Sequence, residues 1–204
     1  MKQLDVLFVH ANASKKIYQD LAKDFSAIEP PIWAGMLASH CRVKGFAVNI
    51  LDCEALHLDE EESAQQIAKA GARLVCFVVY GQQPSASSQN MAGATTLADA
   101  VKAIAPDGKI LFVGGHIAAL PREVLETHGS IDFVCQNEGV YTISNLLKTD
   151  LKEKLEEVDG LGFRRNGSIV LNKPSPIVAK ADLPRELPGI AWDLLPIKNY
   201  RTAL

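Results

Sequence analysis

The chain has 204 residues, of which 48% are hydrophobic, and its formal net charge is −3. This composition supports a packed core and argues against general disorder, while the lack of a basic stripe argues against nucleic-acid binding. The longest apolar runs, such as residues 74–80, are too short to span a bilayer, and the N-terminus shows no signal-peptide pattern. We therefore expect one main cytoplasmic domain that contacts neither nucleic acid nor membrane.

Strand and helix patterns alternate along residues 1–150. Apolar runs predict five strands, at residues 4–9, 46–51, 73–80, 110–113 and 131–135. Helical patterns follow them, at residues 32–44, 63–70, 88–104, 120–128 and 140–147. This alternation predicts an α/β fold, a doubly wound parallel sheet of five strands with right-handed crossovers. We expect the flavodoxin-like (Rossmann-like) order 2-1-3-4-5, with its switch point between strands one and three.

The connections after the strands have unusual compositions. Strand one leads into residues 10–31, a connection much longer than the usual ~2–6 residues. Strand three ends in the small polar residues 81–88, and strand four ends in Gly114-Gly115. A glycine pair allows a sharp turn and a close approach of main chain to a ligand, although a plain tight turn is the alternative. Ligands of open parallel sheets bind outside the carboxyl ends of the strands, so we place the candidate site there.

Single residues in this part of the chain have simpler interpretations. Asp52 ends strand two, and without a G-x-G-x-x-G after strand one it is interpreted as a strand-end cap. Helical spacing assigns Trp33 to core packing. The cysteines at positions 41, 53, 76 and 135 show no C-x-x-C spacing, so no zinc or iron–sulfur site is expected among them.

The pattern changes after residue 150. Asn166-Gly167 between two short strand-like runs predicts a β-hairpin with a type I′ turn. Five prolines between residues 174 and 196 predict a linker. The expected organisation is thus an α/β domain at 1–150, a helix and β-hairpin extension at 151–178, and a Pro-rich tail at 179–204.

Several motifs, taken in order, resemble the N-terminal cobalamin (vitamin B12)-binding domain of the cobalamin-dependent (class B) radical SAM enzymes, a group that includes methyltransferases. The motifs are residues 28–31, 113–125, 132–141, 160–167 and 191–196. Each motif alone is weak, whereas their order and spacing together are fairly specific.

The resemblance implies that the corrin ring lies on the carboxyl edge of the sheet, with its nucleotide tail beside the glycine-rich loop after strand four. The residues implied to bind the cofactor are Asn12, Ser14, Tyr18, Glu29, Tyr80, Gly81, Gln82, Gln83, Ser85, Gly114, Gly115, His116, Asn137, Glu138 and Gly139. Neutral polar groups of this kind suit the many amides of a corrin. Trp33 is a further candidate to flank the ring.

The sequence also departs from the family's pattern. The Asp-x-His-x-x-Gly motif after strand one is absent, so no metal ligand is assigned and His10 is only a displaced candidate for the cobalt. The Ser-x-Leu element after strand three is replaced by Gly81-Gln82-Gln83. No Cys-x-x-x-Cys-x-x-Cys occurs, so S-adenosylmethionine and a [4Fe-4S] cluster would belong to a radical SAM domain in cis.

The resemblance therefore implies a cobalamin-holding domain that is not catalytic by itself. The intact enzyme is expected to transfer methyl groups with cobalt as the carrier, or to run another cobalamin-assisted radical reaction. Two other classes stay open, a flavodoxin-like FMN module and a regulatory interaction module. The residues 10–31 are poor in the Ser and Thr of an FMN phosphate loop, and receiver-like acid clusters are missing after strand one. The substrate and the oligomeric state are not indicated.

Overall fold

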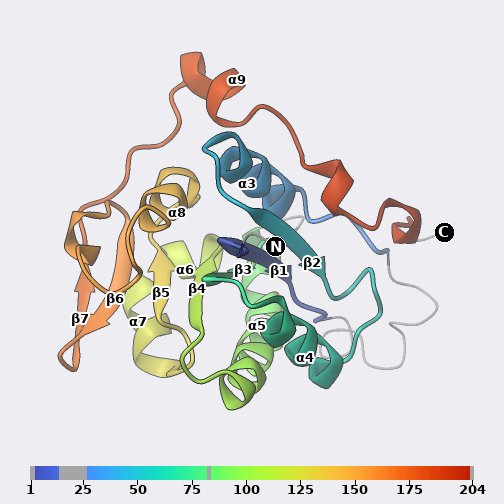
Figure 1. The fold of residues 1–204 in the computed structure, drawn as a ribbon, viewed down its shortest axis with the longest axis horizontal. Helices are drawn as coiled ribbons and strands as arrows, with labels where there is room; N and C mark the ends of the chain where they lie inside the picture. Colours follow the sequence, from blue (N-terminus) through green and yellow to red (C-terminus); the bar gives the residue numbers. More distant parts are fainter. Residues whose placement is uncertain (1–2, 14–26, 82–83, 203–204) are drawn as a thin grey trace.

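A computed structural model describes residues 3–13, 27–81 and 84–202, with backbone only for Pro84 and Ser85. The described strands form one sheet in the order β2-β1-β3-β4-β5-β6-β7 (Figure 1). Their bounds are β1 Val6–His10, β2 Val48–Asp52, β3 Leu74–Val78, β4 Lys109–Val113, β5 Phe133–Cys135, β6 Leu161–Arg165 and β7 Ser168–Leu171. Strands β1 to β5 pair in parallel, which confirms the predicted fold class and the order 2-1-3-4-5.

Helices cover both faces of the sheet (Figure 1). The helices α3 (Ile32–Val43) and α8 (Val140–Leu146) lie on one face, and α4 (Glu60–Ala70), α5 (Pro84–Ile104) and α7 (Pro121–Thr127) lie on the other. Side chains alternate between the two layers, so Phe8 packs toward α3 while Leu7 and Val9 pack toward α5. This burial on both faces explains why the strands appear in the sequence as continuous apolar runs.

Capping residues that can be recognised in the sequence set the ends of helix α4. Asp59 and Glu62 form a reciprocal capping box at the start of α4, and Gly71 ends it in the left-handed conformation. The predicted start of α4 was three residues late because Glu60–Glu62 carry no apolar periodicity. A short helix, α6 (Gly115–Ala119), precedes α7 and was not predicted, since five residues are too few for a helical period.

The predicted hairpin is present, and it joins the main sheet. Asn166 and Gly167 have φ of 51° and 78°, as a type I′ turn requires. Strand β6 pairs antiparallel with β5, through Phe133 opposite Phe163, so the sheet has seven strands and not five. The Arg164 guanidinium donates to the main-chain oxygens of Leu125, Ile131 and His128, the last at 2.7 Å. It thereby ties β6 to the end of α7.

The Pro-rich tail, which we call the strap (residues 179–202), runs along α3 (Figure 1). It contains α9 (Leu183–Glu186) and the 3-10 turns η3 (Lys180–Asp182), η4 (Trp192–Leu194) and η5 (Ile197–Asn199); another turn, η2 (Leu155–Glu157), precedes β6. Ala191 and Leu195 are buried, and Ala191 N donates to Gly35 O at 3.1 Å. The Pro-rich pattern did not predict this packing, because a chain with short turns shows no regular apolar period. That this segment links the domain to a further one stays a prediction.

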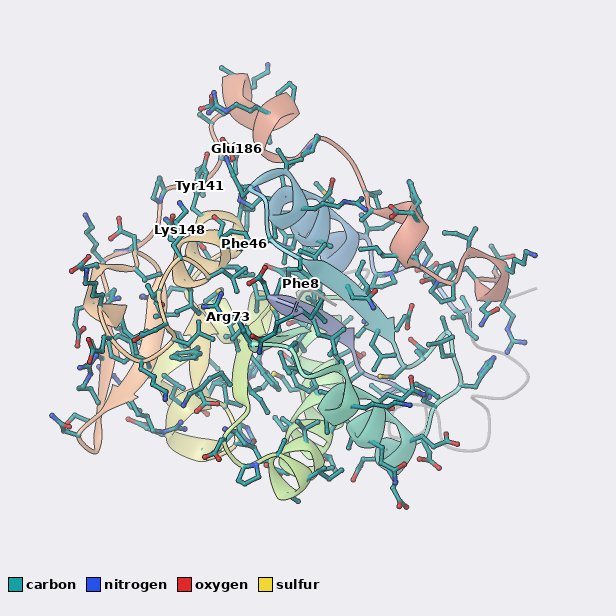
Figure 2. The ribbon with its side chains drawn as sticks, in the orientation of Figure 1. Phe8, Phe46, Arg73, Tyr141, Lys148 and Glu186 are labelled. Carbon is teal, nitrogen blue, oxygen red and sulfur yellow. The ribbon has the colours of Figure 1, made fainter. Side chains whose placement is uncertain are left out.

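Polar contacts hold the strap at both ends. Glu186, labelled with Tyr141 in Figure 2, is 3% exposed, and Lys44 Nζ lies 2.7 Å from its Oε2. At the other end the Tyr200 hydroxyl donates to Asp52 Oδ2 at 2.8 Å. Ala55 N donates to Asp52 Oδ1, which confirms Asp52 as a strand-end cap.

Candidate functional site

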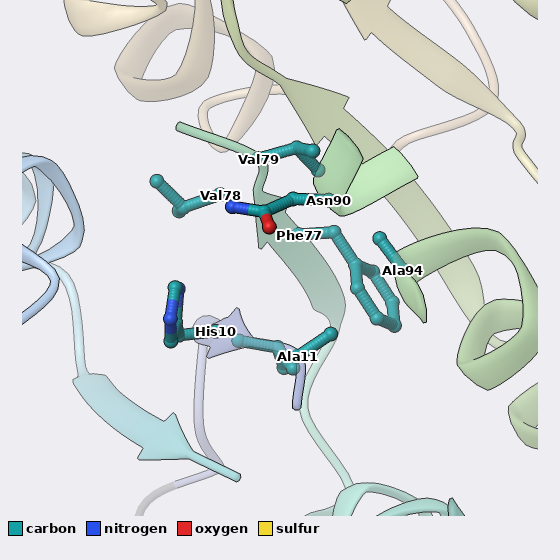
Figure 3. A pocket seen from close by; sticks show the side chains of 8 residues that line it. His10, Ala11, Phe77, Val78, Val79, Asn90 and Ala94 are labelled. Carbon is teal, nitrogen blue, oxygen red and sulfur yellow. The ribbon is translucent and has the colours of Figure 1, made fainter. Parts of the chain in front are cut away.

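The carboxyl ends of β1, β3, β4 and β5 lie at one edge of the sheet, because these strands are parallel neighbours. In the sheet, β2 lies on one side of β1, and β3, β4 and β5 follow on its other side. The switch point therefore falls between β1 and β3, as predicted. A small pocket opens at this point (Figure 3). It is lined by Val9, His10, Ala11, Phe77, Val78, Val79, Asn90 and Ala94.

The pocket is mostly apolar, with two polar side chains. Asn90, from the second turn of α5, donates from Nδ2 to Tyr80 O at 3.1 Å and so fixes the end of β3. Asn90 is not among the residues predicted from the sequence, because its place beside β3 depends on where α5 begins. Its amide is the kind of neutral polar group that orients a ligand in an apolar pocket.

His10 lies at the end of β1 and is engaged by its surroundings. Its Nε2 is 3.3 Å from Glu54 Oε2, and Val78 lines the same pocket as His10. Burial lowers the pKa of His10, but the Glu54 hydrogen bond and the Asp52 and Glu54 charges outweigh it, so the pKa lies above its ordinary value. This arrangement ties β1 to the neighbouring segments, and a role for His10 on the cobalt stays a prediction.

The two glycines after β4 have different surroundings. A Cβ on Gly114 would collide with Val79 O, because the end of β3 runs directly against it. Gly115 is exposed, and a Cβ there would meet only Ser87 Cβ, at an ordinary 3.7 Å. Packing therefore requires Gly114 to be glycine, whereas Gly115 presents open main chain to the edge.

His116 is held against α5. Its main-chain N donates to Ser87 Oγ at 3.0 Å, and its ring Nδ1 lies 2.9 Å from Ser88 Oγ. Ser87 in turn donates to Val79 O. These contacts join the loops after β3 and β4 into one polar surface.

An aromatic pair stands on the α3 side of the same edge. The Trp33 and Tyr80 ring centroids are 5.7 Å apart, at an interplanar angle of 58°. Trp33 Nε1 donates to Glu138 O at 3.0 Å, so α3, the end of β3 and the loop before α8 meet here. Helical spacing correctly placed Trp33 against the core, but it could not show this contact with residue 138.

Three of the remaining predicted residues, Asn137, Glu138 and Gly139, lie in the loop before α8. Asn137 uses its amide internally, donating to Ser175 O at 2.9 Å and accepting from Gly139 N at 3.1 Å. Gly139 has φ of 82° and lies against Val113, so the fold itself requires it. The structure thus gives Asn137 and Gly139 supporting roles, and leaves the exposed Glu138 at the edge.

Gly81 is also constrained by packing, since a Cβ there would collide with Ala86. Asn12 donates to Leu58 O at 3.3 Å, and the exposed Glu29 lies next to Ile28, which pairs with Arg201 of the strap. Ser14, Tyr18, Gln82 and Gln83 lie outside the described residues, and only the backbone of Ser85 is described.

The cysteine thiols do not supply a reactive group to this edge. All four are buried and free. Burial raises the pKa of Cys53 to about 11 and that of Cys41 to about 12, so both thiols stay protonated.

Comparison with known proteins gives the family. The model of the B12 binding domain matches residues 18–147. An uncharacterized methyltransferase from Pyrococcus horikoshii is 28% identical over 173 residues, which are 84% of this chain and 35% of that protein. An anaerobic magnesium-protoporphyrin IX monomethyl ester cyclase from Synechocystis sp. is 24% identical over 172 residues, 84% of this chain and 33% of that protein. The chain thus spans about a third of the length of these relatives.

Solved structures share the fold. The cobalamin-dependent S-adenosylmethionine radical enzyme OxsB, with aqua-cobalamin and S-adenosylmethionine bound, superposes with a TM-score of 0.69 at 18% identity, covering 94% of this chain and 25% of that one. The radical S-adenosylmethionine methyltransferase TsrM from Kitasatospora setae, with cobalamin and a [4Fe-4S] cluster bound, gives 0.59 at 16% identity, covering 88% and 30%. Because the family model covers more than half of its residues, the chain belongs to the B12-binding domain family.

Proposed function

We propose that this chain holds cobalamin across the carboxyl edge of its sheet, as the cofactor module of a longer cobalamin-dependent radical SAM enzyme. The observation that carries the proposal is the open main chain of Gly115 at the same carboxyl edge as the pocket at the switch point, in a member of the B12-binding family. Neither an exposed glycine nor a small pocket is specific alone, but here both lie where this fold class binds ligands.

The donor set fits the cofactor's chemistry. Gly115 exposes main chain, and Asn90 places a neutral amide at the pocket. The nucleotide tail would enter beside the Gly114–His116 loop, where Gly115 and His116 are not buried. The other predicted residues, including the loop positions 82, 83 and 85, would line the corrin amides.

When bound, cobalamin supplies a cobalt centre that can carry a methyl group. The residues of this chain would bind it, orient it and cover one of its sides. The mechanism of the reaction therefore depends on groups outside these residues.

A radical SAM domain in cis, with S-adenosylmethionine and a [4Fe-4S] cluster, is the proposed partner. Support comes from the length of the relatives and from the names of OxsB and TsrM. Tyr200 and Arg201 of the strap lie beside Asp52 and Ile28, at the proposed cofactor edge, and we propose residues 179–204 as the connection to that domain. Methyl transfer is the proposed activity of the whole enzyme, since the Pyrococcus relative is named a methyltransferase.

We propose the cytoplasm as the location of the enzyme. Among the described residues, no helix is long and apolar enough to cross a membrane. The formal net charge of −3 supports the proposal that the protein binds neither anionic lipids nor nucleic acid.

Desalting after mixing with hydroxocobalamin tests this function. The corrin absorption should elute with the protein, and Gly115→Trp should abolish it by filling the space above the main chain. Gly129→Trp is the matched control, because Gly129 is also exposed and has open space around its Cβ position. A folded protein that elutes colourless, or that retains FMN instead, contradicts the proposal.

A further inference from the structure

The turn that follows β2 is attached to a residue of the switch-point pocket. Asp52, the last residue of β2, is the register partner of His10 at the end of β1. Cys53 N donates to His10 O at 2.9 Å, and Glu54 Oε2 lies 3.3 Å from His10 Nε2. Figure 3 shows His10 at the pocket, whereas residues 52–54 are not among those that line it. These residues therefore support a pocket-lining side chain from behind.

The strap holds the same turn from the other side. The Tyr200 hydroxyl donates to Asp52 Oδ2 at 2.8 Å, and Asn199 Nδ2 donates to Ala55 O at 2.8 Å. Asp52 is only 1% exposed, and its other oxygen, Oδ1, accepts from Ala55 N at 3.1 Å. A buried carboxylate that loses a donor is destabilised. The position of the turn and the position of Tyr200 therefore depend on each other.

The end of the strap has little apolar packing of its own. Leu195 is 7% exposed, but after it Ile197 is 50% exposed, and residues 198, 199, 201 and 202 are also exposed. Tyr200 packs only partly buried against the core. Segments with few buried apolar contacts open at a low cost in free energy. The polar contacts with the turn after β2 therefore contribute much of what keeps this end in place.

We propose that Tyr200 and Asp52 are positioning residues for the switch-point pocket, and that residues 196–202 hold His10 in its binding arrangement through the turn after β2. The inference rests on the proposed function, and it adds to the site a part of the chain outside the family match at residues 18–147. Coupling of this kind is reciprocal. If the seated strap end favours the ligand, the ligand favours the seated strap end by the same factor.

Amide hydrogen exchange tests the effect of the ligand on the strap. Asn199 N donates to Pro196 O and Arg201 N donates to Ile28 O, both at 2.9 Å, so these amides report whether the strap end is seated. Neither Asn199 nor Arg201 lines the pocket. Hydroxocobalamin should nevertheless slow their exchange by about fivefold or more, as a coupling between sites usually does.

Spectrophotometric titration with hydroxocobalamin tests the effect of the strap on the ligand. Tyr200→Phe keeps the ring and removes only the hydroxyl, and it should weaken binding by about threefold to tenfold, as one lost hydrogen bond gives. Asn199→Ala, which removes the other contact with the turn, should weaken binding in the same direction. Lys198→Ala is the matched control, because Lys198 is an exposed neighbour in η5, and it should leave the affinity within about twofold.

A double-mutant cycle distinguishes positioning through His10 from any other effect of the hydroxyl. Tyr200→Phe should cost little further affinity in a protein that already carries His10→Ala, because the group it positions is gone. The full loss in both backgrounds would show that Tyr200 does not act through His10. If His10→Ala fails to fold, the exchange measurement on the wild-type chain still decides the matter.

The outcomes distinguish this inference from the proposed function. If hydroxocobalamin binds and exchange at the strap end is unchanged, or if Tyr200→Phe binds with wild-type affinity, the positioning role is overturned while the proposed function stands. Wild-type protein that is folded and does not bind hydroxocobalamin overturns the proposed function, and the positioning role with it.

Discussion

At the scale of single residues, the adjacent glycines after β4 have different roles, one in packing and one in exposing main chain at the edge. Gly114 lies against the carbonyl of Val79, so Gly114→Ala should lower the free energy of unfolding by about 1–3 kcal/mol, the usual range for overpacking. Gly115→Ala has room beside Ser87 and should change that free energy by less than about 1 kcal/mol. Urea titrations followed by circular dichroism measure both.

Substitutions at these two glycines also distinguish an effect on folding from an effect on cobalamin binding. Gly115→Ala should reduce hydroxocobalamin affinity although the domain stays stable, because even a methyl group stands between main chain and ligand. Equal destabilisation by the two substitutions would show that the packing difference at these positions is not real.

The sequence indicated the pair but not this division of roles. A Gly-Gly after an apolar strand predicts a sharp turn and an open edge. Which glycine is required depends on the position of Val79 O, just after β3 and far from Gly114 in the sequence, and no local pattern reports that. Asn90 and the Trp33 contact with residue 138 were missed for the same reason.

At the scale of elements, Arg164 is the main polar contact of the hairpin. It donates to three main-chain oxygens at the end of α7 and before β5. Arg164→Met keeps most of the side chain but leaves these oxygens without their donor, so it should cost about 2–4 kcal/mol of stability. Thermal or urea unfolding of the variant measures this.

Arg165 is the matched control, since its guanidinium pairs with the exposed Glu156 at 3.0 Å. Arg165→Met should cost less than about 1 kcal/mol, as surface pairs usually do. Similar small losses for both variants would show that the hairpin does not depend on Arg164.

The strap should be sensitive to acid through Glu186 and His40. Lys44 and then Arg185 hold the pKa of Glu186 below its ordinary value despite burial. A carboxyl of this kind contributes stability above pH ~4.5 that is lost as the pH falls through its folded pKa. Burial, and then Lys44 and Lys148, lower the pKa of His40 although the carbonyl of Glu186 accepts its Nδ1–H at 2.7 Å. Stability should therefore already begin to fall below pH ~6.5, where an unfolded histidine takes up a proton.

Glu186→Gln tests this directly by unfolding at pH 7, 5.5 and 4. It should cost about 1–2 kcal/mol at pH 7, less than a fully buried pair, because Lys44 and Arg185 reach solvent. It should also flatten the loss between pH 5.5 and 4, while the loss between pH 7 and 5.5 remains. A variant with the wild-type dependence below pH 5.5 would exclude Glu186 as its source.

Elements were predictable where their own residues carry a local signal. The five strands and the helices α3, α4, α5, α7 and α8 have a regular apolar pattern, and the turn at Asn166-Gly167 has the Asn-Gly pair. The short α6 and the strap have no regular apolar pattern, and the docking of β6 on β5 is a non-local pairing with no signal in either strand. The burial of Ala191 of the strap against Gly35 of α3 is also a non-local contact, which a Pro-rich pattern does not report.

At the scale of the whole molecule, the doubly wound sheet brings its unusual loops to one edge. The order 2-1-3-4-5 was predicted from alternation alone, and it suffices to place residues from four strand ends together. The identity of the cofactor was predicted from the family resemblance, because fold and composition do not specify a cofactor. The structure then divides that edge into the pocket and open glycine on the α5 side and the aromatic pair on the α3 side.

The most direct test of cobalamin binding at the carboxyl edge is amide hydrogen exchange with and without hydroxocobalamin. The ligand should slow exchange in the segments that follow β1, β3, β4 and β5, including the amides near Gly115, and leave β7 unchanged. Protection confined to the opposite edge of the sheet or to the hairpin, with the corrin bound, would contradict the account.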